Sequence, residues 1–195
     1  MAFHRRYQRA PFTMSYILFQ GRLQKDWIME KRIIVISGYF NPLHVGHLDY
    51  MEQAKKLGDK LIVIVNNDHQ VKIKRSTPFM NESDRMRIVK SVRCVDNVVL
   101  SLDRDATVVK TLKSVHEMYN LQRGWVVRSN FDVIFANGGD RQEDSTPEEE
   151  FCRQVGIETV YGVGGGKRES SSSLIGNVVT HVAREEFSLK DWDKL

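Results

Sequence analysis

The feature that most constrains the fold is a regular alternation between short apolar runs and longer amphipathic stretches, which begins near Met29. The apolar runs are rich in β-branched residues, as strands are, and the intervening stretches are long enough to form helices. Strands that are apolar throughout are typical of parallel sheets covered on both faces. The pattern therefore predicts an α/β fold, a doubly wound Rossmann-like parallel five-stranded sheet with helices on both faces. The predicted strands are 33–37, 61–65, 98–100, 133–136 and 157–163.

Residues typical of helix starts precede most of the predicted helices. Asn41 is expected to cap the first helix, with Pro42 in its first turn and an apolar stripe that ends at Gly58. Asn81 is expected to cap a second helix at 82–92. Further helices are predicted over about 106–119, from Thr146 and Pro147 onward, and after the serine run 170–173, whereas 121–130 has no assignment.

Length and charge bound the domain organisation. A chain of 195 residues, 41% of them hydrophobic, is long enough for one well-buried domain, which we expect at 29–195. The net charge of +4 resides in residues 1–28, and the remainder has equal numbers of acidic and basic side chains. Because the domain lacks the basic surface that phosphate-backbone binding requires, we expect no nucleic-acid partner.

The basic N-terminal extension, residues 1–28, has three open interpretations. It is an irregular segment packed on the domain, a leader upstream of a natural start at Met29, or a targeting peptide. Cys94 and Cys152 fit neither a metal-binding spacing nor a disulfide framework, which favours a reducing compartment. Apolar runs also fall short of the roughly 20 residues of a membrane span. We therefore expect a cytoplasmic protein with no membrane partner.

Residues suited to anion binding follow the first predicted strand directly, in the segment 38–47, which reads GYFNPLHVGH. Ligands of α/β sheets bind at the carboxyl ends of strands, where helix N-termini present free N–H groups. His44 and His47 lie on one face of the predicted helix and can both donate to phosphate oxygens, while Gly46 lets a ligand approach the backbone. Histidines at a helix start also serve as caps, and a metal site lacks a third ligand. The segment thus favours a triphosphate site.

Three later segments have side chains that suit phosphates. Lys72 and Lys74 follow the second predicted strand, where they neutralise phosphate oxygens or belong to a solvated basic loop. The segment 137–141, NGGDR, follows a strand and is either a plain turn or a close contact to a nucleotide. The segment 164–173, GGGKRESSSS, leads through cations into hydroxyls at a helix start. An apolar helical pattern follows, which argues against a serine-rich linker.

The segment 38–47, between its strand and its helix, resembles the G-x-F-x-x-x-H-x-G-H signature of the cytidylyltransferase-like nucleotidyltransferase superfamily. The resemblance runs from about Lys31 to Val179. The G-G-D turn within 137–141 is similar to that of heptose 1-phosphate adenylyltransferases, more than to its counterpart in glycerol phosphate cytidylyltransferases. The segment 164–173 is similar to the serine and threonine signature that closes over the triphosphate. There Lys167 or Arg168 stands in place of the arginine of some relatives.

The resemblance implies a nucleotidyltransferase that transfers a nucleoside monophosphate from ATP or CTP to a phosphorylated small molecule, such as a sugar phosphate, and releases pyrophosphate. Mg²⁺ is expected with the triphosphate, and a homodimer is expected. Arg85 matches an arginine that braces the site near the phosphates, with a surface ion pair as the alternative. The implied catalytic residues are His44, His47, Lys72, Lys74 and Arg85; the implied nucleotide-binding residues are Gly38, Tyr39, Phe40, Asn41, His44, Gly46, His47, Gly139, Asp140, Lys167, Ser170, Ser171, Ser172 and Ser173.

Several functions remain open at this point. Within the enzyme class, the alternatives are a glycerol phosphate-type cytidylyltransferase and an FMN adenylyltransferase. A nucleotide-binding regulator without turnover is a further alternative, which the intact His44, His47 and Lys167 argue against. The last alternative is a protein that binds nucleic acid through its N-terminal extension.

Overall fold

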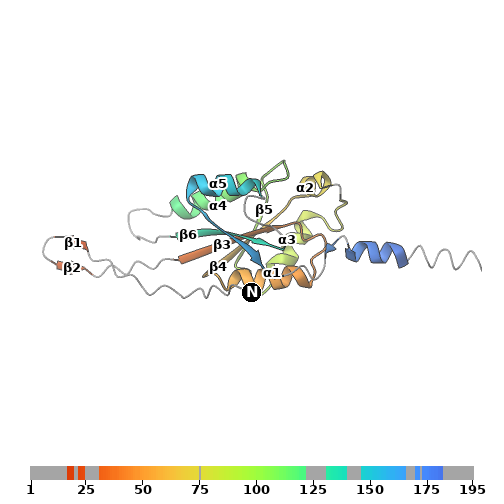
Figure 1. The fold of residues 1–195 in the computed structure, drawn as a ribbon, viewed down its shortest axis with the longest axis horizontal. Helices are drawn as coiled ribbons and strands as arrows, with labels where there is room; N and C mark the ends of the chain where they lie inside the picture. The colour runs from red at the N-terminus through yellow and green to blue at the C-terminus, as the bar shows by residue number, and fades with distance from the viewer. Residues whose placement is uncertain are drawn as a thin grey trace, which may run out of the picture.

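A computed structural model describes residues 17–19, 22–24, 31–74, 76–121, 131–139, 146–165, 170–171 and 173–181. Five strands form one sheet in the order β5-β4-β3-β6-β7, and every neighbouring pair is parallel (Figure 1). Each predicted strand falls on one of them, within two residues at either end. They are β3 (Lys31–Gly38), β4 (Lys60–Val65), β5 (Asn97–Leu100), β6 (Phe131–Gly138) and β7 (Glu158–Val163).

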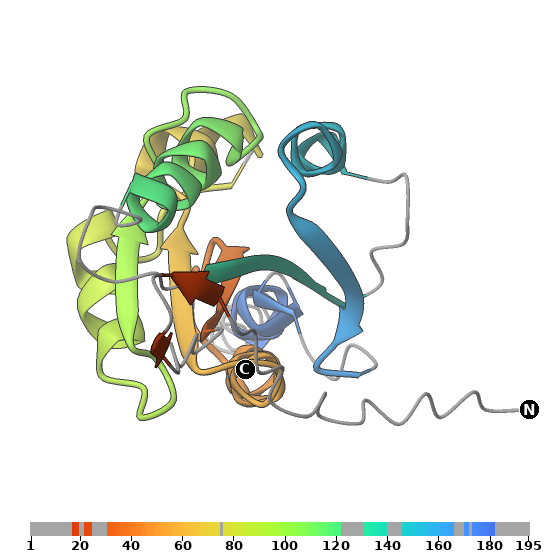
Figure 2. The ribbon, with the colours of Figure 1, turned by 90° about the vertical axis from the view of Figure 1, so that its left-hand side faces the viewer.

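Helices cover both faces of this sheet, as the apolar strands predict. α1 (Val45–Lys55) and α3 (Glu82–Lys90) lie on one face, and α4 (Val109–Leu121) and α5 (Pro147–Val155) lie on the other (Figures 1 and 2). Successive residues of β3 alternate between the two cores. Ile33 and Val35 belong to the core beneath α4 and α5, and Ile34 and Ile36 to the core beneath α1 and α3. The α/β doubly wound fold is thus confirmed.

The strand order places a topological switch point between β3 and β6. From β3 the chain moves to β4 and β5 on one side, and it then returns to β6 and β7 on the other side. Ligands of such sheets bind at the carboxyl ends of the strands where the direction of winding reverses. Segment 38–47 begins at the last residue of β3, and Gly138 ends β6. The predicted phosphate-binding segment therefore occupies the expected place.

The first helix begins later than predicted. Its N-cap is His44, whereas Asn41 and Pro42 precede the helix and are joined by a cis peptide bond. The amide of Asn41 is bound to a distant loop, since it accepts from the Phe79 N–H at 2.6 Å and donates to the Thr77 carbonyl at 2.9 Å. The prediction that Asn41 caps the helix was wrong because a tertiary contact uses both polar atoms of its side chain.

A short helix that the sequence analysis did not predict, α2 (Asp68–Ile73), lies at the carboxyl edge of the sheet. Asn67 caps it: its Oδ1 accepts from the Gln70 N–H at 2.9 Å, and Gln70 Oε1 accepts from the Asn67 N–H at 3.1 Å. The buried amide of Gln70 also donates to the carbonyls of Asp105 and Thr107. These bonds fix α2 against the loop that follows β5.

Three predicted helix starts are confirmed. Asn81 caps α3 and accepts from the Asp84 N–H at 2.9 Å. Thr146 is the N-cap of α5, with Pro147 in its first turn. Residues 173–181 are helical, and the Ser170 hydroxyl accepts from the N–H of Ser173. The third predicted helix, α4, begins at Val109, three residues later than expected.

The N-terminal extension has local order where it is described. β1 (Ile17–Phe19) and β2 (Arg22–Gln24) form an antiparallel pair that is not part of the five-stranded sheet. These six residues are regular, and the three interpretations of the extension stay predictions. The rest of 1–28 and the unassigned stretch 122–130 lie outside the described residues. In the part of the chain that the structure describes, no helix has both the length and the apolar character needed to cross a membrane.

Candidate functional site

The two histidines of segment 38–47 lie side by side at the start of α1. Their rings stack with centroids 3.8 Å apart and planes 28° apart. The Phe40 and His47 rings form a T-shaped pair with centroids 4.9 Å apart. His47 Nδ1 accepts a hydrogen bond from the backbone N–H of His44 at 3.3 Å. Because Nδ1 is the acceptor, the ring proton of neutral His47 lies on Nε2. His47 therefore has one N–H available for an anion.

His47 is a neutral donor. Burial, the neighbouring His44 and the charge of Lys74 together lower its pKa from 6.5 to about 3. The largest cause is burial, because a charged imidazole loses its hydration when it is buried. His47 is thus uncharged near neutral pH, and it offers a hydrogen bond without the cost of burying a cation.

A lysine supplies the positive charge beside these rings. The ammonium group of Lys74 lies 4.6 Å from the centroid of the Tyr39 ring, a cation–π distance. Its positive charge also lowers the pKa of His47. The sequence left Lys72 and Lys74 as equal candidates. Both are exposed, Lys72 on α2 and Lys74 at its C-cap. Of the two, Lys74 is the one whose ammonium group lies over Tyr39 and whose charge lowers the pKa of His47.

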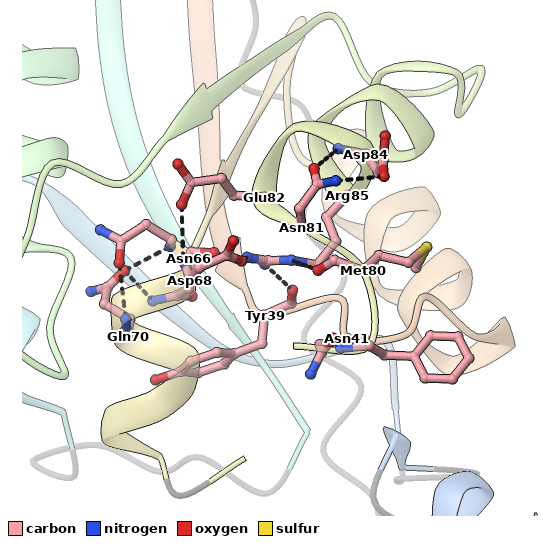
Figure 3. Close-up of polar contacts among 12 residues, drawn as sticks. Tyr39, Asn41, Asn66, Asp68, Gln70, Met80, Asn81, Glu82, Asp84 and Arg85 are labelled. Atoms are coloured by element: carbon pink, nitrogen blue, oxygen red, sulfur yellow. Dashed lines mark hydrogen bonds and ion pairs between the residues drawn. The ribbon is translucent and has the colours of Figure 1, made fainter. Parts of the chain in front are cut away.

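Arg85 is fully buried and braces the site from beneath. Its Nη1 donates to the carbonyls of Tyr39 at 2.6 Å and Asn66 at 2.7 Å, and its Nε donates to the Met80 carbonyl at 3.2 Å (Figure 3). Its Nη2 lies 2.7 Å from Asp68 Oδ1, and the side chain is 0% exposed. A surface ion pair, the alternative for Arg85, is therefore excluded. The guanidinium group joins the ends of β3 and β4 to the start of α3.

The same group of contacts holds α2, which leads to Lys74. The backbone N–H of Asp68 donates to Glu82 of α3 at 2.9 Å. The side chain of Asn67 donates to the carbonyls of Ser101 at 3.0 Å and Asp103 at 2.8 Å, beyond the end of β5. These residues are mostly buried, so the bonds are shielded from water. Lys74 thus extends from a helix that is fixed at its base.

The serine segment reaches the histidine motif from the opposite end of the chain. The Ser171 hydroxyl donates to the carbonyl of Pro42 at 2.9 Å. The structure thus confirms that the start of helix 173–181 lies beside segment 38–47. Three residues predicted to bind the nucleotide, Asp140, Lys167 and Ser172, lie outside the described residues.

Two of the predicted glycines have conformational reasons to be glycine. Gly139, just after β6, has a φ of 71°, a conformation that residues other than glycine rarely adopt. A Cβ at Gly38 would lie 2.6 Å from the Phe40 ring, so that ring packs directly on the backbone of β3. Phe40 itself has a φ of 49°, which is rare for a bulky residue and indicates a tightly constrained turn. Gly46 lies in the first turn of α1.

The sequence analysis missed helix α2 and the loop contact made by Asn41. Asn67 and Gln70 have the spacing of a capping box, so α2 had a detectable signal. The role of Asn41 had no such signal, because its partners lie 36 and 38 residues away. Within the described residues, no group of three His, Cys, Asp or Glu side chains could hold a metal ion.

Several known proteins are similar to this chain. The family model described as cytidylyltransferase-like matches residues 35–159. The FAD synthase of Pyrococcus abyssi is 34% identical over 127 residues, which cover 64% of this chain and 74% of that protein. The bifunctional protein HldE of Koribacter versatilis is 39% identical over 77 residues, covering 38% of this chain and 16% of that protein. A lipopolysaccharide core biosynthesis protein from Thermoplasma volcanium matches with a TM-score of 0.50 and 25% identity, over 68% of this chain and 94% of that chain.

We predict that Arg85→Met lowers the free energy of unfolding by about 3 kcal/mol, because it leaves Asp68 and three carbonyls without their donor. Arg87→Met is the matched control, since Arg87 is exposed on the same helix, and it should change stability by less than about 0.5 kcal/mol. Urea unfolding followed by circular dichroism measures both. Equal stabilities for the two variants would mean that Arg85 is not the brace.

The lowered pKa of His47 predicts a pH dependence of stability. Between pH 6.5 and about 3 the unfolded chain binds one more proton at this residue than the folded chain does. Stability therefore falls as the pH falls through this range, by up to about 1.4 kcal/mol per pH unit. In His47→Asn this contribution is absent. Urea unfolding at pH 6.5, 5.5 and 4.5 should give a shallower loss for the variant, and parallel losses would contradict the assignment.

Proposed function

The chain belongs to the cytidylyltransferase-like family and is a nucleotidyltransferase, and from this premise we propose that it transfers the adenylyl group of ATP to the phosphate of FMN. The observation that carries the proposal is the pair of stacked histidines at the start of α1, with the charge of Lys74 beside them. A helix N-terminus, a neutral N–H donor and a nearby cation together suit a triphosphate.

In the proposed reaction a phosphate oxygen of the acceptor attacks the α-phosphorus of ATP in line. The new P–O bond forms as the bond to the bridging oxygen of the β-phosphate breaks, and pyrophosphate carries away that electron pair. No covalent enzyme intermediate is needed. His44 and His47 stabilise the charge that grows on the phosphate oxygens, and neither has to transfer a proton. The low pKa of His47 suits this donor role.

We assign Lys74 to the phosphates and Arg85 to positioning. Lys74 is exposed at the rim, with its ammonium group over the Tyr39 ring and its charge acting on His47. Arg85 has its hydrogen bonds directed to Tyr39, Asn66, Met80 and Asp68. It therefore fixes the segments that contact the substrate rather than the substrate itself. Ser170, Ser171 and Gly139 are assigned to the nucleotide, as the family resemblance implies.

Two observations favour FMN as the acceptor. The Pyrococcus abyssi relative, which aligns over 64% of this chain, is named FAD synthase, and FAD forms from FMN by gain of an adenylyl group. Large apolar side chains are also exposed on loops at the carboxyl edge: Phe79 is 65% exposed and Leu102 is 61% exposed. Asn41 ties the Phe79 loop to the histidine motif. A planar ring system removes more of such apolar surface from water than a hydroxyl-rich sugar does.

A sugar phosphate is the second candidate. It is favoured by the Gly138–Gly139 turn, which is similar to that of heptose 1-phosphate adenylyltransferases, and by the match to HldE. We further propose that Mg²⁺ enters as part of the ATP complex, that the enzyme is cytoplasmic, and that it is a homodimer.

The purified protein with Mg²⁺ and ATP should release pyrophosphate when FMN is added. Each of the four common ribonucleoside triphosphates should be tested with FMN, a set of sugar phosphates and glycerol phosphate. We expect turnover with ATP and FMN, and a loss of about a hundredfold to a thousandfold in His47→Ala. Turnover with a sugar phosphate alone would transfer the proposal to the second candidate, and CTP with glycerol phosphate would replace both. Triphosphate binding without turnover on any acceptor would favour a regulator.

The two lysines can be separated by matched variants. We predict that Lys74→Gln lowers kcat/KM about a hundredfold, because the charge beside His47 is lost. Lys72→Gln should stay within about threefold of the wild type. Steady-state kinetics with ATP and the productive acceptor measure both. A larger loss in Lys72→Gln would reverse the assignment.

A further inference from the structure

We infer that Tyr50 is a positioning residue for the nucleotide, one that sets the distance between the histidine helix and the glycine turns after β6 and β7. The inference rests on the proposed function, in which His47, Gly139 after β6 and the serine segment that follows the turn after β7 bind the same nucleotide. Tyr50 lies on α1, three residues after His47 and therefore on the same face of the helix.

The first contact joins the Tyr50 hydroxyl to β6. It donates to the carbonyl of Ala136 at 2.5 Å, across 86 residues of sequence. The pairing of β6 with β7 is irregular at this point, since the register shifts between Ala136 and Gly138. The hydroxyl therefore binds a carbonyl at an irregular part of the sheet, next to the predicted nucleotide-binding turn.

The second contact joins the Tyr50 ring to Gly138. A Cβ at this glycine would lie 2.8 Å from both Cδ2 and Cε2 of the ring, closer than real Cβ atoms approach. Gly138 has no positive φ, so its backbone alone would accept alanine. The absence of a side chain at 138 is thus explained by the Tyr50 ring, which fills that space.

The third contact joins the backbone of Tyr50 to the turn after β7. A Cβ at Gly164 would lie 2.9 Å from the Cα of Tyr50 and 3.2 Å from its N. Here the helix backbone, and not the ring, is the obstacle. The end of β6 and the turn after β7 therefore both pack against one residue of α1. Through Tyr50, the position of His47 is tied to the segments proposed to hold the nucleotide.

This geometry predicts how the variants combine. Tyr50→Phe removes only the hydroxyl and should weaken MgATP binding about tenfold, with the KM of the acceptor unchanged within twofold. Gly138→Ala should weaken MgATP binding at least as much. Because the three atoms nearest to the added methyl all belong to the ring, Gly138→Ala should cost little more in a Tyr50→Ala background. Gly164→Ala should keep its full cost there, since the backbone of residue 50 remains and the φ of 92° at Gly164 disfavours a side chain in any background.

Calorimetric titration with MgATP, together with KM values for ATP and for the productive acceptor, tests the inference, and urea unfolding verifies that each variant is folded. Independent effects of Gly138→Ala and Tyr50→Ala, or an equal rise of both KM values in Tyr50→Phe, would overturn it. If the wild type binds no triphosphate, the proposed function fails and the inference with it. If the wild type binds MgATP and Tyr50→Phe binds it equally well, only the positioning role fails.

Discussion

The site depends on one buried interaction, the guanidinium group of Arg85 among the backbone carbonyls of Tyr39, Asn66 and Met80 and the carboxylate of Asp68. The first two carbonyls follow the ends of β3 and β4, where the sheet no longer supplies N–H partners, and buried carbonyls need donors. A guanidinium group has five N–H donors, enough for these four acceptors at once, whereas a lysine ammonium has three. Arg85 therefore cross-links the segments at the carboxyl edge of the sheet, in addition to the packing of apolar side chains.

Burial and charge are separated within this site. His47 is desolvated and therefore neutral, and the nearest assigned cation, Lys74, lies at the exposed rim. This separation has a physical reason, because an unpaired cation inside the site would lose its hydration before any anion arrived. At the rim the ammonium group stays near water and lies 4.6 Å from the centroid of the Tyr39 ring, a cation–π contact. A triphosphate would then meet neutral donors at the helix start and mobile charge at the edge.

The sequence predicted the features that arise from local pattern. The apolar runs located all five strands of the sheet, and Asn81 and Thr146 marked the starts of α3 and α5, because these signals depend on near neighbours. Prediction from the sequence failed for side chains whose contacts are with residues far away in the chain. Asn41 has the same chemistry as Asn81, yet its amide binds a loop some 36 residues away, so no local rule distinguishes the two. Tyr50 likewise resembles an ordinary helix residue facing the core until Gly138 and Gly164 are placed against it.

The two halves of the carboxyl edge are built in different ways, and the difference matches the two substrates of the proposed reaction. Beyond β4 and β5, side chains such as Asn67 and Gln70 hold the loops, and exposed residues such as Phe79 stand at the rim. Beyond β6 and β7, glycines bring the backbone against α1. A backbone-lined half can recognise an invariant nucleotide through N–H and C=O groups, whatever its side chains. A half lined by side chains can change its acceptor by substitution, as long as Lys74, which we assign to the phosphates, is kept. A change of acceptor in this fold should therefore require changes beside β4 and β5 and leave the Tyr50 contacts intact.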